Sequence, residues 1–274
     1  MKNRIVFLGL IGLCLSFSSL SAQSPILLYE AMPSQELQRY YQQRGVKSYT
    51  LTNYRVYKGD TLTRGVYKLM QFDPFGRIIY DSTATAMGRQ FRYNYNAQGQ
   101  LDRISKRNMK GDGYTLVEND SLGRKIKEVE ISHRLDTNEV RTYFYDANNR
   151  LSRKVATNLA TTAETTYTYD ESGHLTQSLT TTQTIKGEVK TGTIYRRDAR
   201  GNIVGLRELK DGNVRQVDDY LYNDYGQIVE RRLPGKGEYY RYYYNHLSLL
   251  IRVEVYDINR RNLKGWQVYD YTFH

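Results

Sequence analysis

Apolar and polar residues alternate through most of the chain, and the alternation is most regular where two tyrosines stand two residues apart. Residues two apart lie on the same face of a β-strand. Each pair is followed by a turn signal and, in most copies, by Ile or Leu, which predicts a strand, a tight turn and a second strand. The clearest pairs are Tyr93/Tyr95, Tyr143/Tyr145, Tyr167/Tyr169, Tyr220/Tyr222 and Tyr242/Tyr244.

The turn signal has a fixed form, with Asp or Asn three residues before Gly or a substitute for Gly. The Asp or Asn side chain accepts backbone N–H groups just ahead of it, and Gly or Asn tolerates the left-handed conformation that closes a hairpin. Eight copies, 22 to 28 residues apart, predict a repeat protein. The first position holds Asp73, Asn96, Asp120, Asp146, Asp170, Asp198, Asn223 and Asn245, and the last holds Gly76, Gly99, Gly123, Asn149, Gly173, Gly201, Gly226 and Ser248.

The predicted fold is all-β: a repetitive antiparallel β-hairpin meander that forms an extended, twisted or spiralling sheet. Residues 71–274 form the repeat domain of about eight copies. Residues 23–70 are predicted as an N-terminal cap, with a short helix over Gln35–Gln43 and a degenerate hairpin. A terminal cap would cover the edge strand that an open sheet exposes. The pattern is compatible with an open sheet and with one that closes on itself.

The repeated unit Tyr-x-Tyr-Asp-x-x-Gly-x-Leu/Ile resembles the YD repeat of the RHS family. It is best seen from Tyr167 to Leu175, whereas Asn223 replaces the Asp in the copy from Tyr220 to Ile228. The resemblance implies extended or spiralling β-sheets, which in large members of that family form a hollow shell around a toxin. Because this chain has no toxin-like C-terminal domain, we do not expect it to encapsulate a toxin or to cleave itself.

Residues 1–22 have the features of a secretory signal peptide. Lys2 and Arg4 precede an apolar run, and small residues lead to a cleavage site after Ala22. We therefore expect an exported protein, located in the periplasm, associated with the outer membrane or at the cell surface, with no stable membrane span after cleavage. Cys14 is the single cysteine and lies in this segment, so the mature chain is expected to lack disulfides.

Composition favours a thin sheet with wide solvent exposure over a deep globular core. The chain has 27 Tyr against seven Phe and one Trp, with a mean hydropathy of −0.68. Its formal net charge is +11, and loss of Lys2 and Arg4 with the signal peptide would leave +9. For an exported protein, the electrostatic field of this positive charge favours an envelope protein or an anionic glycan or lipopolysaccharide as partner. We expect no nucleic acid as partner.

No arrangement of residues predicts catalysis, a metal or a cofactor. The four histidines do not pair at metal-ligand spacing, and motifs for a serine nucleophile, a zinc protease or a phosphate loop are absent. The turn carboxylates recur about 9–10 Å apart, a separation that an inverting glycosidase could use. Their presence in most repeats is better explained by turn formation. We expect a non-enzyme, with an enzyme acting on cell-wall or surface glycan as an alternative.

The tyrosine rows are either ordinary packing or an exposed aromatic platform flanked by basic side chains. A platform could stack on sugar rings or on a peptide. The predicted binding surface consists of Tyr93, Tyr95, Tyr143, Tyr145, Tyr167, Tyr169, Tyr220, Tyr222, Tyr242, Tyr244, Arg92 and Arg241.

The predicted function is a non-catalytic binding or scaffolding module of the envelope, in protein assembly or glycan contact. One alternative is a shell or immunity-like partner of a secreted effector, which rests on the resemblance alone. Another is an outer-membrane β-barrel, which needs a continuous apolar band facing lipid. That band would be interrupted by Arg103, Lys127, Arg153, Glu230 and Arg252.

Overall fold

The computed structural model describes residues 34–57, 60–84, 88–109, 111–257, 259 and 262–274. The predicted signal peptide and the segment 23–33 lie outside these residues. One α-helix, one short 3-10 helix and eighteen strands are described. Their bounds are α2 (Ser34–Gln43), β1 (Val46–Tyr57), β2 (Asp60–Phe72), β3 (Ile78–Thr83), β4 (Arg89–Tyr95), β5 (Leu101–Asn108), β6 (Gly111–Asn119), β7 (Lys125–Ile131), β8 (Thr137–Tyr145), β9 (Leu151–Thr157), β10 (Thr162–Tyr169), β11 (Leu175–Thr184), β12 (Gly187–Arg197), β13 (Ile203–Lys210), β14 (Asn213–Tyr222), β15 (Ile228–Leu233), η1 (Pro234–Lys236), β16 (Glu238–Tyr244), β17 (Leu250–Asp257) and β18 (Leu263–Phe273).

The strands form one antiparallel sheet in which each strand pairs with its neighbours in sequence, so the predicted all-β meander is confirmed. The open or spiralling form of that prediction is wrong, because β1 also pairs with β18. This pairing runs from Val46 opposite Phe273 to Arg55 opposite Gly265 and closes the sheet into a barrel. Closure leaves no described strand as a free edge, and a free edge is what an extended sheet must protect.

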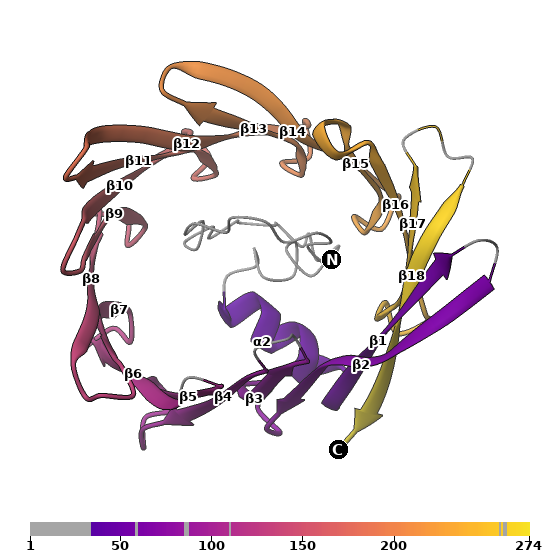
Figure 1. Ribbon diagram of the computed structural model, residues 1–274, viewed down its shortest axis with the longest axis horizontal. Coiled ribbons are helices and arrows are strands. Elements are labelled where there is room, and N and C mark those ends of the chain that lie inside the picture. Colours follow the sequence, from indigo (N-terminus) through magenta and orange to yellow (C-terminus); the bar gives the residue numbers. More distant parts are fainter. Residues whose placement is uncertain (1–33, 58–59, 85–87, 110, 258, 260–261) are drawn as a thin grey trace.

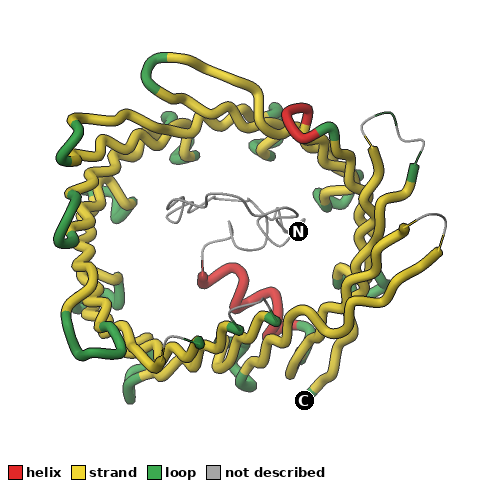
Figure 2. Tube along the Cα trace, viewed as in Figure 1, coloured by secondary structure: helices red, strands yellow, loops and turns green. Residues whose placement is uncertain are grey.

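The two ends of the barrel differ in their connections (Figure 2). The repeated Asp/Asn turns all lie at one end, the turn end, where they bend toward the inside of the ring. The intervening hairpins lie at the other end, the loop end, and those between β5 and β14 project outward. Each repeat contributes two antiparallel strands, as predicted, so the chain returns to the same end of the barrel once in every repeat. All turns of one kind therefore lie at the same end.

Each repeated turn is held by the hydrogen bonds that its sequence predicts. Asp146 is typical: its Oδ1 accepts the backbone N–H of Asn148 at 2.9 Å and that of Arg150 at 2.8 Å. The N–H of Asn149 donates to the Asp146 carbonyl at 3.0 Å, and Asn149 has a φ of 61°. Ser248 takes the same left-handed conformation, with a φ of 61°, in place of glycine.

The inner face of the wall carries the core. Helix α2 lies inside the ring (Figure 1), and its Tyr41 ring packs against Tyr49 of β1 and Phe72 of β2. The strand register carries the same face around the barrel, so that every second residue points inward. The buried core joins Leu51, Leu151, Leu175, Ile203, Ile228 and Val253 to the tyrosines of the repeats.

Helix α2 begins at Ser34 and ends at Gln43, within one residue of the predicted helix. It packs over the seam where β1 meets β2 and β18, instead of covering an open edge. Its side chains bridge two turns of the turn end: Gln38 donates to the Phe75 carbonyl at 3.0 Å, and Tyr40 donates to the Ser248 carbonyl at 2.5 Å. The predicted degenerate hairpin is β1 and β2, which are full members of the barrel.

Candidate functional site

The ten tyrosines of the predicted binding surface lie together on the inner face. Tyr167, Tyr220 and Tyr242 are buried, with exposed fractions of 7%, 3% and 6%. The other seven are partly exposed. The three buried rings are packed as core residues, whereas the other seven keep part of their surface exposed on the inner face.

The two arginines of that predicted surface lie on the opposite face. Arg92 pairs with Tyr80 and Ser105 in register, and its neighbour Tyr93 points inward. Arg241 pairs with Glu230 and Glu254 on the outside, one residue from the buried Tyr242. A single surface that combines these tyrosines with Arg92 and Arg241 is therefore wrong. Adjacent residues in a strand alternate between faces, so the sequence already held this information.

The second tyrosine of each pair fastens one repeat to the preceding one. Its hydroxyl donates to the carbonyl of the first residue of a strand in the previous repeat, with O–O distances of 2.7–2.9 Å. These bonds join Tyr95 to Ile78, Tyr145 to Lys125, Tyr169 to Leu151, Tyr222 to Ile203, Tyr244 to Ile228 and Tyr271 to Leu250. Asn119 and Arg197 donate in the two remaining repeats, to Leu101 and Leu175. These six tyrosines therefore have a structural role, because each one ties a repeat to the repeat before it. We call them the clip tyrosines.

A polar residue not predicted from the sequence stands four positions after seven of the eight turn residues, whereas buried Leu249 holds this place after Asn245. The polar side chain bonds the free oxygen or amide of the turn residue: Arg150 Nε lies 2.8 Å from Asp146 Oδ2, and Asn96 Nδ2 lies 3.1 Å from Gln100 Oε1. Three arginines of this set also stack on the clip tyrosine of the next repeat at 4.6–4.7 Å. These pairs are Arg77 with Tyr95, Arg124 with Tyr145 and Arg150 with Tyr169.

Two groups of charged side chains on the inner face, around Asp218 and around Glu128, are paired and largely buried. Arg231 holds Asp218 through two bonds of 2.8 and 3.0 Å, and the two side chains are 4% and 5% exposed. Glu128 accepts from Tyr143 at 2.7 Å and lies 2.6 Å from Lys125. Burial alone would raise the pKa of Glu128, but Lys125 and Tyr143 outweigh it and lower that pKa to about 2. Such groups stabilise the wall from within.

The outer face carries exposed ion pairs around the barrel. Their side chains are about one-third to one-half exposed in the three pairs with the clearest outward register. These are Lys127 with Glu118 at 3.2 Å, Arg153 with Glu164 at 3.6 Å and Arg196 with Asp219 at 2.9 Å. The outer face therefore carries exposed charged pairs across β6–β7, β9–β10 and β12–β14, beside exposed apolar side chains such as Leu116 and Leu221.

The turn carboxylates are occupied by the turns themselves. The backbone N–H of Arg150 is the main cause that lowers the pKa of Asp146, and the Arg150 side chain adds to it. A carboxylate held ionised in this way is unsuited to act as a general acid. His174 lies at a turn, 3.4 Å from Asp170. Within the described ranges, no three His, Cys, Asp or Glu side chains are grouped closely enough to hold a metal ion.

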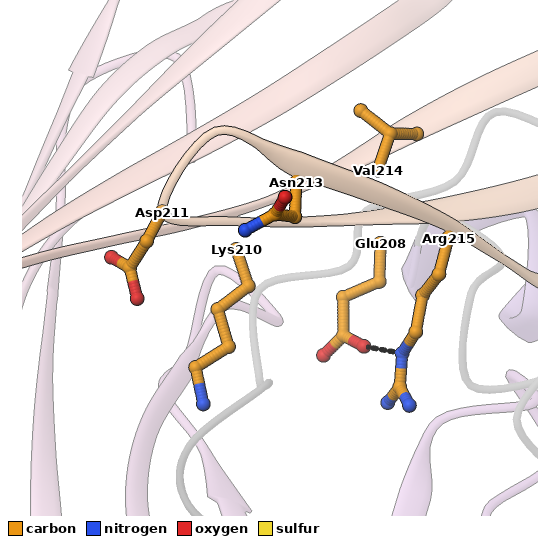
Figure 3. A pocket seen from close by; sticks show the side chains of 6 residues that line it. All are labelled: Glu208, Lys210, Asp211, Asn213, Val214 and Arg215. Atoms are coloured by element: carbon orange, nitrogen blue, oxygen red, sulfur yellow. Dashed lines mark hydrogen bonds and ion pairs between the residues drawn. The ribbon is translucent and has the colours of Figure 1, made fainter.

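A hollow of about 420 Å³ lies beneath the β13–β14 hairpin at the loop end (Figure 3). It is lined by Glu208, Lys210, Asp211, Asn213, Val214 and Arg215, and an ion pair between Glu208 and Arg215 spans it. These side chains offer charged contacts but no nucleophile paired with a base.

No helix within the described residues is both long enough and apolar enough to cross a membrane.

No family model matches the chain, and no curated protein matches it. Similar solved structures include porin-like proteins from Bacteroides uniformis and Bacteroides vulgatus. The first is 10% identical with a TM-score of 0.41, covering 84% of this chain and 96% of that one. The second is 11% identical with a TM-score of 0.42, covering 83% and 98%. A TcdB2-TccC3 structure is 12% identical with a TM-score of 0.26, and the match covers 72% of this chain but 14% of that one. Similarity at this level establishes no function for the chain.

Proposed function

We propose that the protein is an exported, non-catalytic β-barrel that acts as a scaffold on the water side of an envelope membrane. The observation that carries this proposal is the polarity of the wall, with the apolar core inside and exposed ion pairs outside. A barrel embedded in lipid has the reverse order, with an apolar band outward. The signal peptide predicted from residues 1–22 supports the envelope location.

The resemblance to YD repeats belongs to the same proposal. The clip tyrosines, the Asp/Asn turns and a hollow shell-like wall are what a small member with repeats alone would have. The clips connect each repeat to the one before it, so the wall needs no cargo to hold its shape. A shell or immunity-like role toward a secreted effector has no further support in the described residues.

An outer-membrane β-barrel is the second candidate function, and closure of the sheet favours it over an open binding sheet. A strand that spans a bilayer must have all of its backbone groups paired, which only a closed barrel achieves. The described strands meet that condition. The exposed ion pairs of the outer wall favour the water-side scaffold, because in a bilayer an ion pair such as Arg196 with Asp219 would have to leave water.

Fractionation of the exported chain tests the proposal. We expect alkaline carbonate to release it from membranes, and we expect it to purify as a folded β-protein without detergent. Retention in the carbonate pellet together with a need for detergent would instead establish the membrane barrel.

A substitution in the wall gives the same test a second readout. Leu179 is half-buried in the middle of β11, in register with Thr166 and Gly192 on the outer face. Leu179→Arg should change the free energy of unfolding by about 1 kcal/mol or less in a water-facing wall. In a lipid-facing wall the same change would cost about 2–4 kcal/mol and block assembly.

A further inference from the structure

Four consecutive hairpins of the loop end each carry one large apolar side chain at the tip, almost fully in solvent. Met109 lies after β5, Leu135 between β7 and β8, Leu159 between β9 and β10, and Ile185 between β11 and β12. Their exposed fractions are 77%, 75%, 100% and 95%. Successive tips are two strands apart, roughly 10 Å. The strands that these hairpins join, β5 to β12, follow one another along one side of the ring (Figure 1), so the four residues lie in sequence along that side of the loop end. We call them the apolar tips.

The backbone at Leu135 is a second, independent sign that these side chains are not incidental. Leu135 has a φ of 67°, in the left-handed region that glycine, Asn and Asp favour. Its turn repeats the geometry of the Asp/Asn turns, with Leu135 N–H bonded to the Ser132 carbonyl at 3.0 Å. Glycine would fit this position better. An exposed leucine here is unfavourable both for the backbone and for solvation, and contact with an apolar phase would offset the second cost.

Charge at the loop end favours an anionic surface. Two acidic residues near the tips are already paired, with Asp112 lying 3.3 Å from Arg107 and Glu188 lying 3.0 Å from Lys190. Lys186, next to Ile185, has no ion-pair partner among the described residues. Arg134 is likewise unpaired but is offset by Asp136 on the other side of Leu135. The preference therefore rests on Lys186 and on the net charge of +9 expected for the exported chain.

We propose that the apolar tips dock the barrel onto a phospholipid bilayer with anionic headgroups, inserting Met109, Leu135, Leu159 and Ile185 at the interface. Single apolar side chains among polar neighbours enter the boundary between headgroups and acyl chains and go no deeper. The charged outer wall that begins behind the tips stops further insertion. This inference rests on the proposed water-side barrel, for which the tips supply the contact with the membrane.

Flotation with lipid vesicles tests the docking. The full exported chain, purified without detergent, is mixed with vesicles of phosphatidylethanolamine and phosphatidylglycerol in roughly a 3:1 ratio, in which phosphatidylglycerol supplies the anionic headgroups. We expect it to float with these vesicles, less with phosphatidylcholine, and to be released by alkaline carbonate. The double variant Leu159→Ser/Ile185→Ser should lower the partition on the order of 100-fold, since each side chain loses its whole apolar burial.

A matched control uses exposed apolar residues of the turn end. Leu122 and Tyr225 are 67% and 84% exposed, and Leu122→Ser/Tyr225→Ser should float as the unchanged chain does. Lys186→Glu should reduce flotation with the anionic vesicles and leave phosphatidylcholine unaffected. Circular dichroism checks that each variant is folded.

The failures of the two proposals can be told apart. A folded chain that stays in solution with both vesicle types overturns the docking but leaves the water-side barrel intact. The docking is also overturned if Leu159→Ser/Ile185→Ser still floats with the vesicles, or if this double variant only converts a dimer to a monomer. The water-side barrel stays intact in both cases. A chain that resists carbonate and needs detergent overturns both.

Discussion

Asp218 and Asp219 are neighbours in β14, and each pairs with an arginine, yet the two pairs belong to different environments. Asp218 faces inward and is held by Arg231, with both side chains 5% exposed or less. Asp219 faces outward and lies 2.9 Å from Arg196, with side chains 35% and 51% exposed. Two adjacent residues of β14 therefore have their side chains in different surroundings: that of Asp218 is buried on the inner face, and that of Asp219 is partly exposed on the outer face.

Under the proposed water-side barrel, this contrast makes the two faces of the wall opposite in polarity to those of a membrane barrel. Most buried apolar residues, the clip tyrosines and the buried charges share the inner face, whereas the outer face carries exposed ion pairs with exposed apolar side chains such as Phe144 and Leu221 between them. In a membrane barrel, lumen residues tune selectivity and lipid-facing residues set stability. Here the reverse division is expected, with stability set from within and the outer face tolerant of change.

The largest expected difference is between the two aspartates themselves. Asp218→Asn should cost about 3–5 kcal/mol, because it leaves the Arg231 guanidinium buried without its counter-charge. Asp219→Asn should cost about 0–1 kcal/mol, as for other exposed pairs. Urea unfolding measures both. Equal costs would mean that the two pairs are equally buried, and a larger cost at Asp219 would mean that the outer face is the buried one.

The second contrast concerns the turn end, where some turns touch helix α2 and others face open space. A Cβ on Gly76 would lie 2.2 Å from the Gln38 carbonyl oxygen, whereas one on Gly226 would meet nothing within 4 Å. Both glycines have a φ of 75°. Gly76→Ala should cost roughly 2–4 kcal/mol, and Gly226→Ala roughly 1–2 kcal/mol. Thermal unfolding of the two variants thus isolates the docking of α2, and equal costs would mean that the helix is not seated on this turn.

Within the inner face, the clip can be separated from simple packing at one tyrosine pair. Tyr169 donates to the Leu151 carbonyl at 2.8 Å, so Tyr169→Phe should cost about 0.5–1.5 kcal/mol. The Tyr167 hydroxyl is buried and has no hydrogen-bond partner among the residues described, so Tyr167→Phe should be neutral or slightly stabilising. Denaturant midpoints at constant m-value give the answer. A cost at Tyr167 as large as at Tyr169 would contradict the clip.

The local parts of this architecture could be predicted from sequence because their causes are local. The Asp/Asn turns, the strands beside them and helix α2 each depend on residues within a few positions, and all three predictions are confirmed. Pairing of Asp146 with Arg150 was equally local and visible as Arg four residues after Asp, but it was missed. The same holds for the opposite faces of Arg241 and Tyr242.

Closure could not be predicted in the same way. It depends on β1 meeting β18, so that Tyr49 lies opposite Tyr271 more than two hundred residues away. Neither strand carries a local signal for that partner, because any alternating strand offers the same backbone groups. Only the accumulated twist and tilt of eighteen strands decide whether the ends meet.

The smallest expected effect lies where the two faces end, at Leu135 on the loop end. The left-handed backbone conformation at this position is less favourable for leucine than for glycine, so Leu135→Gly should stabilise the folded state. Part of this stabilisation is lost because glycine has more conformational freedom in the unfolded chain. The balance should stabilise the barrel by about 0.5–1 kcal/mol. Leu135→Asn, which keeps a side chain suited to this φ but removes the apolar surface, should stabilise it less. Both variants should bind anionic vesicles more weakly than the unchanged chain. This combination of higher stability and weaker binding would mean that Leu135 contributes to membrane contact at the expense of the fold. A loss of stability in both variants would show that Leu135 serves the turn alone.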